Sequence, residues 1–333
     1  MLHVGRIESA PVAGDDVPAI VAALADARRV LVTMHRFPDG DALGSALGLA
    51  QALREWGKQP TVYSADPVPT VFRFLPGAER VVDRVGAAER FDVSVSCDAG
   101  DAHRLGPDFP GPERRGLLVN LDHHPTTPRF GDLNLLDPGA ASVGVLVHRL
   151  LVAAGRPPSR DTALALFVSL VTDTGSFRYA NAGPEAHRLA ASLLETGIDP
   201  WDVTSRIYES QPPERLALLS RVLGTLAVEC GGRLASIAVT RAMREEAGTD
   251  EEIEGGFVAY PRSIAGVEVA ICFREAEGDL VRVSLRSRGG ADVSAIAARF
   301  GGGGHRQAAG CALAGRLPEI RERVLAAARD LLS

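Results

Sequence analysis

The sequence has few of the features that mark disulfide-linked, thiolate-zinc or membrane proteins. Its 333 residues include only 4 cysteines, and no two of them form a CxxC pair. This argues against a disulfide framework or a zinc site built from thiolates, and it is typical of a reducing cytoplasm. The best candidate for a membrane span, residues 141–155, is interrupted by His148 and Arg149. Residues 1–16 lack a basic segment followed by an apolar block, so we expect no export signal.

Positive charge and aromatic side chains are also scarce. A net charge of −6 is unsuited to gripping long duplex DNA, and 5% aromatic residues leave little for a long single-strand stacking track. The charge is uneven, however, because residues 281–306 carry five arginines and only one acid, Asp292. The arginines are Arg282, Arg286, Arg288, Arg299 and Arg306. A small basic site in an acidic protein suits a short or small phosphorylated ligand.

The first half of the chain alternates between apolar runs and helical segments. We expect strands at 29–34, 60–65, 91–100 and 116–122, and helices at 41–57 and 161–175. Nearly continuous apolar strands separated by helices indicate a parallel sheet that is covered on both faces. The predicted fold class is therefore α/β, with a first domain over residues 1–190.

A helical connector and a smaller second α/β domain should follow. Three helical segments that begin with proline or Asp-Pro lie between residues 183 and 228, and we assign 191–228 to the connector. The second domain should cover 229–333. Its expected elements are strands at 233–240, 267–276 and 279–288, the last two as a hairpin, then a helix at 291–300, a glycine-rich loop and a helix at 317–332.

Four short motifs place polar side chains where predicted elements end. They are "HRFPDGDALGS" at 35–45, "SCDAGD" at 96–101, "NLDHH" at 120–124 and "LVTDTGSF" at 170–177. Singly, each has an ordinary explanation. Pro-Asp-Gly is a turn signal and Asp41 can cap the next helix, while Asp98 can be a loop residue. Asp173 is less ordinary, since an acid at the end of a helix opposes the helix dipole.

Taken together, the motifs indicate a metal site. Ligands of an open parallel sheet bind outside the carboxyl ends of its strands, so these side chains should share one crevice. Pooled carboxylates repel one another unless cations are present. Imidazole and carboxylate without thiolate favour Mn²⁺, with Mg²⁺, Co²⁺ or Fe²⁺ less favoured. Because neighbouring residues of an extended segment point in opposite directions, His123 and His124 should not serve the same metal, and Asp122 can orient one of the rings.

The motifs resemble those of a known family. "HRFPDGDALGS", "CDAGD", "LDHH" and "VTDTGSFR" look like the four motifs of the DHH phosphoesterase family. "GFVAYPRSIAGVEVAICFRE" and "GGGGHRQAAG" resemble its C-terminal substrate-binding domain. The resemblance covers essentially the whole chain. Length and layout are most similar to members that hydrolyse short oligoribonucleotides and 3′-phosphoadenosine 5′-phosphate (pAp) to mononucleotides.

The resemblance implies an active enzyme with two divalent cations, Mn²⁺ by preference. His35, Asp39 and Asp98 would hold one ion. The other would be held by Asp41, Asp98, His123 and Asp173, with Asp98 bridging. His124 would contact the scissile phosphate, and Asp122 is the second residue expected to take part in catalysis. Two such ions activate a water and clamp the phosphate oxygens.

The C-terminal domain should recognise the substrate. The glycine run and the residues after it, Gly303, Gly304 and His305, offer backbone N–H groups suited to an anion. The alternative, a flexible linker, is less favoured because the run is short and lies within a domain. Arg286 and Ser287 at a predicted strand end can bind a terminal phosphate. The expected partners are short RNA or a mononucleotide bisphosphate, with no long duplex DNA and no membrane.

Other activities stay open on the sequence alone. Within the family, the same residues suit a cyclic di-AMP or linear dinucleotide phosphodiesterase, or a pyrophosphatase or exopolyphosphatase. A single-strand DNA exonuclease would normally need a longer chain. A nucleotide-sensing protein without catalysis is disfavoured because every expected metal ligand is present. A dinucleotide-dependent redox enzyme lacks the glycine fingerprint after the first strand. Residues 141–170 can form a homodimer surface or the core.

Overall fold

The structure is a computed structural model that describes residues 16–249 and 256–333. The expectation about an export signal falls almost entirely on residues 1–15, outside the described ranges. The chain divides into two compact units between Ser210 and Gln211, within the range predicted as connector. We call them the N-terminal and C-terminal units. Among the described residues, no helix combines the length and apolar character needed to cross a bilayer.

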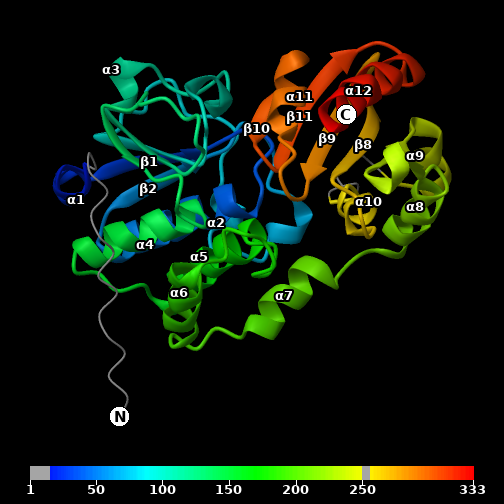
Figure 1. Ribbon diagram of the computed structural model, residues 1–333. Coiled ribbons are helices and arrows are strands. Elements are labelled where there is room, and N and C mark those ends of the chain that lie inside the picture. Colours follow the sequence, from blue (N-terminus) through cyan, green and yellow to red (C-terminus); the bar gives the residue numbers. More distant parts are fainter. Residues whose placement is uncertain (1–15, 250–255) are drawn as a thin grey trace. The chain divides into compact units, whose positions relative to one another are not determined.

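The N-terminal unit is built on a five-stranded parallel sheet with the strand order β2-β1-β3-β4-β5 (Figure 1). The strands are β1 (Arg29–Met34), β2 (Gln59–Tyr63), β3 (Val93–Cys97), β4 (Leu117–Asp122) and β5 (Leu133–Leu136). Sequence analysis predicted the first four and missed β5, whose four residues are too few to show a period. In this order β2 and β3 are the two neighbours of β1, one on each side, so the direction in which the sheet grows reverses after β2. This creates a switch point at the carboxyl ends of β1 and β3, where such sheets bind ligands.

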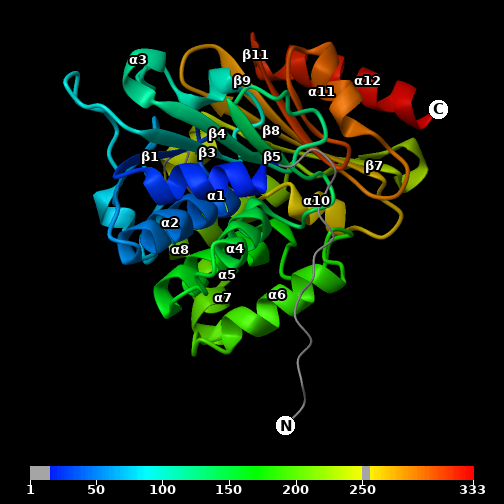
Figure 2. The same cartoon turned by 90° about the vertical axis from the view of Figure 1, so that its left-hand side faces the viewer.

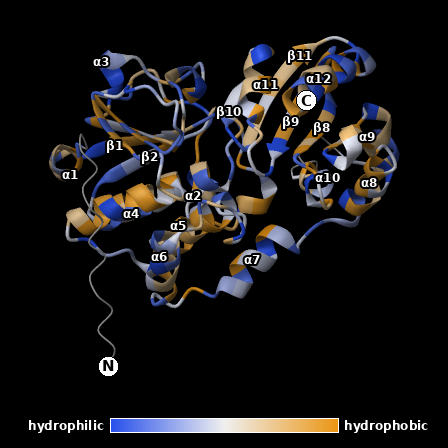
Figure 3. Cartoon of the chain, viewed as in Figure 1, coloured by the Kyte–Doolittle hydropathy of each residue, from blue (hydrophilic) through white to orange (hydrophobic). Residues whose placement is uncertain are grey.

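Long helices cover one face of this sheet. They are α1 (Val17–Asp26), α2 (Gly40–Glu55) and α4 (Val143–Ala153), which Figure 2 shows on the same side of the strands. Helix α5 (Arg160–Asp173) packs against α2 and α4. Val30, Val32 and Met34 of β1 point into this core. Most of α4 is apolar (Figure 3), and residues 141–170 contribute mainly to the core of their own unit. On the other face, Leu31 and Tyr63 pack under irregular segments that contain Val85 and Phe91.

Helices α2 and α5 pack unusually closely because small residues recur every four positions along α2. A Cβ atom on Gly44 would lie 2.5 Å from the carbonyl oxygen of Ala165, and one on Gly48 would lie 2.8 Å from a methyl carbon of Leu166. Gly40 faces Thr172 in the same way. The glycines therefore fix the start of α2 against the end of α5, where two of the four motifs lie.

The helices predicted around the connector are present and begin with proline as expected. These are α6 (Pro184–Leu194), α7 (Pro200–Tyr208) and α8 (Pro213–Leu223). Helices α6 and α7 belong to the N-terminal unit, and α8 belongs to the C-terminal unit. The role of 191–228 as a connector stays a prediction.

The C-terminal unit contains a six-stranded sheet in the order β10-β11-β9-β8-β7-β6. Its strands are β6 (Ala227–Glu229), β7 (Leu234–Val239), β8 (Val269–Ala276), β9 (Leu280–Ser287), β10 (Gly303–His305) and β11 (Ala308–Ala314). Strands β8 and β9 form the predicted antiparallel hairpin. Helices α11 (Val293–Arg299) and α12 (Leu317–Leu332) pack on one face. On the other face, α8 and the residues next to the short helix α10 (Ala259–Ser263) cover β7 and β8, and α9 (Arg241–Ala247) packs against α8.

The prediction of a glycine-rich loop over residues 301–304 was partly wrong, because the second half of this run lies in a strand. Gly303 and Gly304 begin β10, which pairs with β11, and β11 in turn pairs with β9. A Cβ on Gly304 would lie 2.5 Å from the carbonyl oxygen of Ala308. A Cβ on Gly302 would overlap the carbonyl oxygen of Gly310. These two glycines are explained by the close approach of β11. The short strands were missed because glycine and alanine give no hydrophobic period.

Candidate metal centre

The four motifs meet at the carboxyl edge of the parallel sheet. His35 follows β1, Asp98 follows β3, and His123 follows β4. Asp39 and Asp41 lie at the start of α2, and Asp173 is the last residue of α5. Because the switch point lies between β1 and β3, their loops open onto the same edge, and α2 leads straight from it. All six side chains expected to bind metal are therefore brought together, in two groups.

The first group, which we call the His35 subsite, consists of His35, Asp39 and Asp98. The Nε2 atom of His35 lies 3.8 Å from Oδ1 of Asp39 and 3.6 Å from Oδ2 of Asp98. Its Nδ1 lies 2.7 Å from the carbonyl oxygen of Arg36 and donates to it, so Nε2 is left to face the carboxylates. Asp39 also caps α2 by accepting from the backbone N–H groups of Asp41 and Ala42. The capping role expected for Asp41 thus belongs to Asp39.

The second group, the His123 subsite, consists of Asp41, His123 and Asp173. The Nε2 atom of His123 lies 3.5 Å from Oδ2 of Asp41 and 3.7 Å from Oδ2 of Asp173. Its Nδ1 donates to the carbonyl oxygen of Ala140 at 3.0 Å, which again leaves Nε2 directed at the acids. The amide of Asn181 donates to Oδ2 of Asp173 at 3.2 Å and orients that carboxylate.

Asp98 lies between the two subsites. Its Oδ1 is 3.7 Å from Nε2 of His123, while its Oδ2 faces His35. The residue is 3% exposed and has a left-handed backbone with φ of 59°, held by its N–H bond to Leu121. Oδ1 is buried and accepts no hydrogen bond among the described residues, although Nδ1 of His124 lies 3.4 Å from it. A buried carboxylate oxygen without a donor is costly, and a bound cation removes that cost. The donor set therefore fits two divalent cations that share Asp98.

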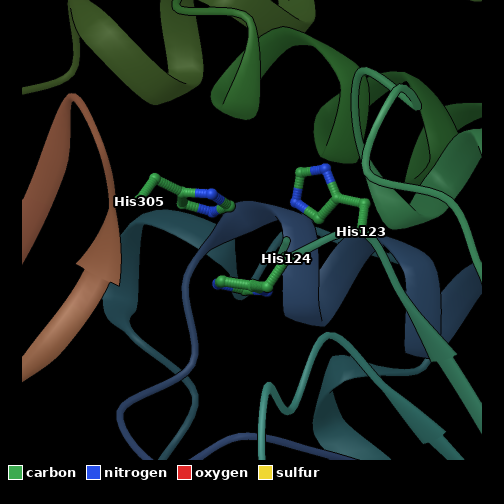
Figure 4. Close-up of side chains that lie close together, drawn as sticks. All are labelled: His123, His124 and His305. Carbon is green, nitrogen blue, oxygen red and sulfur yellow. The ribbon is translucent and has the colours of Figure 1, made fainter. Parts of the chain in front are cut away.

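The rings of the adjacent histidines differ in orientation, but a nitrogen of each lies within 4.8 Å of one of the other, so their service to different metals stays a prediction. Their ring centroids are 5.4 Å apart, the ring planes differ by 75°, and Figure 4 shows the rings on different sides of the chain. Nδ1 of His124 lies 2.8 Å from Oδ1 of Asp122. Asp122 also accepts from the N–H groups of His124 and Gly100. Burial alone would raise the pKa of Asp122, but His124 and these N–H groups lower it to about 2, so Asp122 is an ionised partner that holds the ring.

Crowding shifts the pKa values of the subsite residues. Burial lowers the pKa of His35 and His123, but the neighbouring carboxylates outweigh it and raise the two values to about 10 and about 9. Burial, followed by the charge of Asp98, raises the pKa of Asp41 well above its usual range. Burial also raises the pKa of Asp173, to about 7. The same concentration of negative charge attracts a divalent cation, which would favour the ionised acids.

In the C-terminal unit, the residues expected to bind phosphate do not all share a face. Arg286 and Ser287 are neighbours on β9 and point to opposite sides of the sheet. Ser287 is 5% exposed, and its hydroxyl donates to the carbonyl oxygen of Ala291 at 2.8 Å. The face of Arg286 instead carries Ser284 and Arg282, with Arg274 directly across from Arg282. The alternation of apolar and polar residues in "VRVSLRS" (281–287) is the sequence signal that places Arg286 and Ser287 on opposite faces of the sheet.

Comparison with known families agrees with this geometry. The DHH family N-terminal domain matches residues 29–170, and the DHHA1 domain matches residues 234–333. The first range contains β1 to β5 and five of the six expected metal ligands. The second contains β7 to β11 and the expected phosphate-binding residues. The chain belongs to the DHH family.

Individual relatives share both domains. A Thermus thermophilus protein named bifunctional oligoribonuclease and PAP phosphatase NrnA is 38% identical, over 91% of this chain and 90% of its own. A Bacillus subtilis protein of the same name is 24% identical, over 85% of this chain and 89% of its own. The solved structure of an exopolyphosphatase-related protein from Bacteroides fragilis has a TM-score of 0.86 and 27% identity, covering 95% of this chain and 97% of that one.

Some residues around the site were not identified from the sequence. Asn181, which orients Asp173, lies eight residues beyond it in a loop without a motif. Ser169, which contacts Asp41 across 128 positions, lies within an apolar helix. In each case the contact depends on how α5 packs, which no local pattern reports.

Proposed function

We propose that this protein is a dinuclear-metal phosphoesterase that hydrolyses short oligoribonucleotides and pAp to mononucleotides. The observation that carries the proposal is the buried Oδ1 of Asp98, which accepts no hydrogen bond in the described part of the chain and lies between two groups of imidazole and carboxylate ligands. The names of the Thermus and Bacillus relatives, which align over most of both chains, support the choice of substrate. A cytoplasmic location is part of the proposal. It is supported by the small number of cysteines and by the finding that no helix among the described residues could span a membrane.

Mn²⁺ is the cation we favour, because both subsites offer imidazole nitrogen and carboxylate oxygen and no thiolate. His35, Asp39 and Asp98 would hold one ion, and Asp41, Asp98, His123 and Asp173 the other. When bound, two such cations supply an activated water and neutralise charge on the phosphate. The protein fixes their ligands. Nδ1 of each ligand histidine donates to a backbone carbonyl oxygen. This hydrogen bond fixes the tautomer of the neutral ring, so that the lone pair of Nε2 is available for the cation.

His124 is the proposed catalytic residue for the phosphate. Asp122 accepts from its Nδ1 and fixes the ring, and Nε2 is a donor when the imidazole carries both protons. A donor held in this way can bind a phosphoryl oxygen or protonate the departing ribose oxygen. Asp122 therefore acts through His124 as a positioning residue.

Phosphate recognition is assigned to Arg286, Gly303, Gly304 and His305 of the C-terminal unit. Arg286 is half-buried, and its backbone pairs with Ala270 of β8 on one side and with Ala308 of β11 on the other. The pairing limits the movement of its backbone. Guanidinium groups bind phosphate through paired donors. Ser287 was predicted to bind phosphate too. Because its hydroxyl is taken by Ala291, we assign it to holding the end of β9.

The test is a hydrolysis assay with Mn²⁺ on pAp, RNAs from dinucleotides to decanucleotides, cyclic di-AMP and pyrophosphate. We expect pAp and the shortest RNAs to be hydrolysed fastest, with Asp98→Ala inactive. Arg286→Ala should raise KM for these substrates, while Arg299→Ala, which alters an arginine on α11 that pairs with Asp330, should not. Turnover of pyrophosphate alone would overturn the substrate assignment. Preferential turnover of cyclic di-AMP would replace it with the dinucleotide phosphodiesterase.

A further inference from the structure

Ser169 is a buried hydroxyl one turn before Asp173 on α5, and the proposed reaction does not use it. It is 0% exposed. Its Oγ lies 2.6 Å from Oδ1 of Asp41 and 2.9 Å from Oγ of Ser142, and it accepts from the N–H of Gly144 at 3.0 Å. One hydroxyl therefore joins the end of α5, the start of α4 and a proposed metal ligand on α2.

The directions of these hydrogen bonds follow from the chemistry of the groups. A carboxylate only accepts, so the single proton of Ser169 goes to Asp41. The hydroxyl of Ser142 must then donate to Ser169, as the N–H of Gly144 does. That N–H belongs to the first turn of α4, where the helix dipole is positive. Two donors into Ser169 strengthen the bond that it donates to Asp41.

The carboxylate of Asp41 is consequently fixed in one orientation. Oδ1 accepts from Ser169, and the N–H of Val143 donates to both carboxylate oxygens, at 3.1 Å from Oδ1 and 2.9 Å from Oδ2. Oδ2 is then the oxygen that faces Nε2 of His123. The arrangement depends on glycine at 144, because a Cβ there would overlap Oγ of Ser169.

We propose that Ser169 is a positioning residue that sets the affinity of the His123 subsite for its cation by fixing the Asp41 carboxylate. The inference rests on the proposed metal centre. Removing a hydrogen bond that orients a metal ligand lowers metal affinity by roughly 10–100-fold. The His35 subsite takes its own ligands from the ends of β1 and β3 and from the cap of α2, so its affinity should be retained.

The experiment is a Mn²⁺ titration of the metal-stripped full chain, with free Mn²⁺ counted by electron paramagnetic resonance. Ser169→Ala is compared with Ser45→Ala. Ser45 is a matched control, because it is also 0% exposed and contacts the same aspartate, but its hydroxyl donates to the backbone carbonyl of Asp41 at 2.7 Å. We expect Ser169→Ala to weaken one of the two sites by roughly 10–100-fold. Ser45→Ala should leave both sites unchanged.

Two further backgrounds locate the effect. In His35→Ala, which leaves the His123 subsite, adding Ser169→Ala should weaken the remaining ion by the same factor. In His123→Ala, which leaves the His35 subsite, it should change nothing. Ser169→Cys keeps a donor at this position, although a weaker one on a larger sulfur atom, and should weaken the site less than Ser169→Ala. It replaces Ser169→Ala if that variant does not fold.

Equal weakening of both sites, or an equal effect of Ser45→Ala, would overturn the inference. A wild-type protein that binds no Mn²⁺ would instead overturn the proposed metal centre, and with it the role of Ser169.

Discussion

The two proposed metal subsites share Asp98 but differ in how the protein encloses them. In the His35 subsite, the side chain of His35 is 7% exposed, but that of Asp39, the N-cap of α2, is 63% exposed. In the His123 subsite, the side chains of Asp41, His123 and Asp173 are 2%, 6% and 29% exposed. A ligand set enclosed by helices loses little freedom on binding a cation, whereas an exposed carboxylate stays hydrated. The difference implies one tightly held ion and one that exchanges more readily.

Asp98→Ala should have the largest effect because this residue faces both subsites. We expect the loss of measurable binding at one subsite, marked weakening at the other, and a fall in hydrolysis of at least about 10³-fold, since several kcal/mol of electrostatic stabilisation is lost. Calorimetry with Mn²⁺ measures binding at the two subsites, and an assay with pAp measures hydrolysis. Retention of two tight ions would show that Asp98 is not shared.

The comparison of His35→Ala with His123→Ala tests the asymmetry directly. Mn²⁺ release from the wild type into excess chelator should show a fast and a slow phase. His35→Ala should remove the fast phase, and His123→Ala should remove the slow phase, because the enclosed subsite holds its ion longer. The reverse assignment would contradict the link between enclosure and exchange.

The pH dependence of metal binding sharpens the same contrast. Without metal, the pKa values of His123 and Asp173 are raised to about 9 and about 7, and that of Asp41 is raised too. A cation needs these groups deprotonated, so its binding releases protons and its apparent affinity rises with pH. In the His35 subsite, the pKa of His35 is raised, to about 10. We expect both affinities to rise from pH 6 to pH 8, more steeply at the His123 subsite, as measured by Mn²⁺ titration in His35→Ala and His123→Ala.

Gly44→Ala should have the smallest effect. The added Cβ would lie 2.5 Å from the carbonyl oxygen of Ala165, so α2 and α5 must separate, at a cost of about 1–3 kcal/mol in the free energy of unfolding. Separation moves Asp41 away from Asp173 and should weaken the His123 subsite more than the His35 subsite. Chemical denaturation and Mn²⁺ titration measure these changes. Gly183→Ala is the control, because its φ is −76° and no atom lies within 4 Å of the added Cβ.

Much of the metal centre was readable from the sequence. His35, Asp98 and His123 each follow an apolar run, and the carboxyl ends of parallel strands share an edge, so their meeting required only the strand assignment. Strand alternation predicted different orientations for the rings of His123 and His124, and the ring planes differ by 75°. The chemistry of the site was set by the residue types, since carboxylates and imidazoles without thiolate indicate the class of cation.

Only the tertiary structure decided how the two subsites differ. The buried Oδ1 of Asp98, which accepts no hydrogen bond from the described residues, and the bond from Ser169 to Asp41 depend on segments far apart in the chain. The contact of Asn181 with Asp173 spans only eight residues, but it depends on how the chain turns after α5. The strands β10 and β11 were likewise invisible, because glycine and alanine can pair closely without any hydrophobic period. Sequence patterns report the local environment of a residue, whereas enclosure and hydrogen-bond partners depend on how helices pack, which involves residues that no local pattern connects.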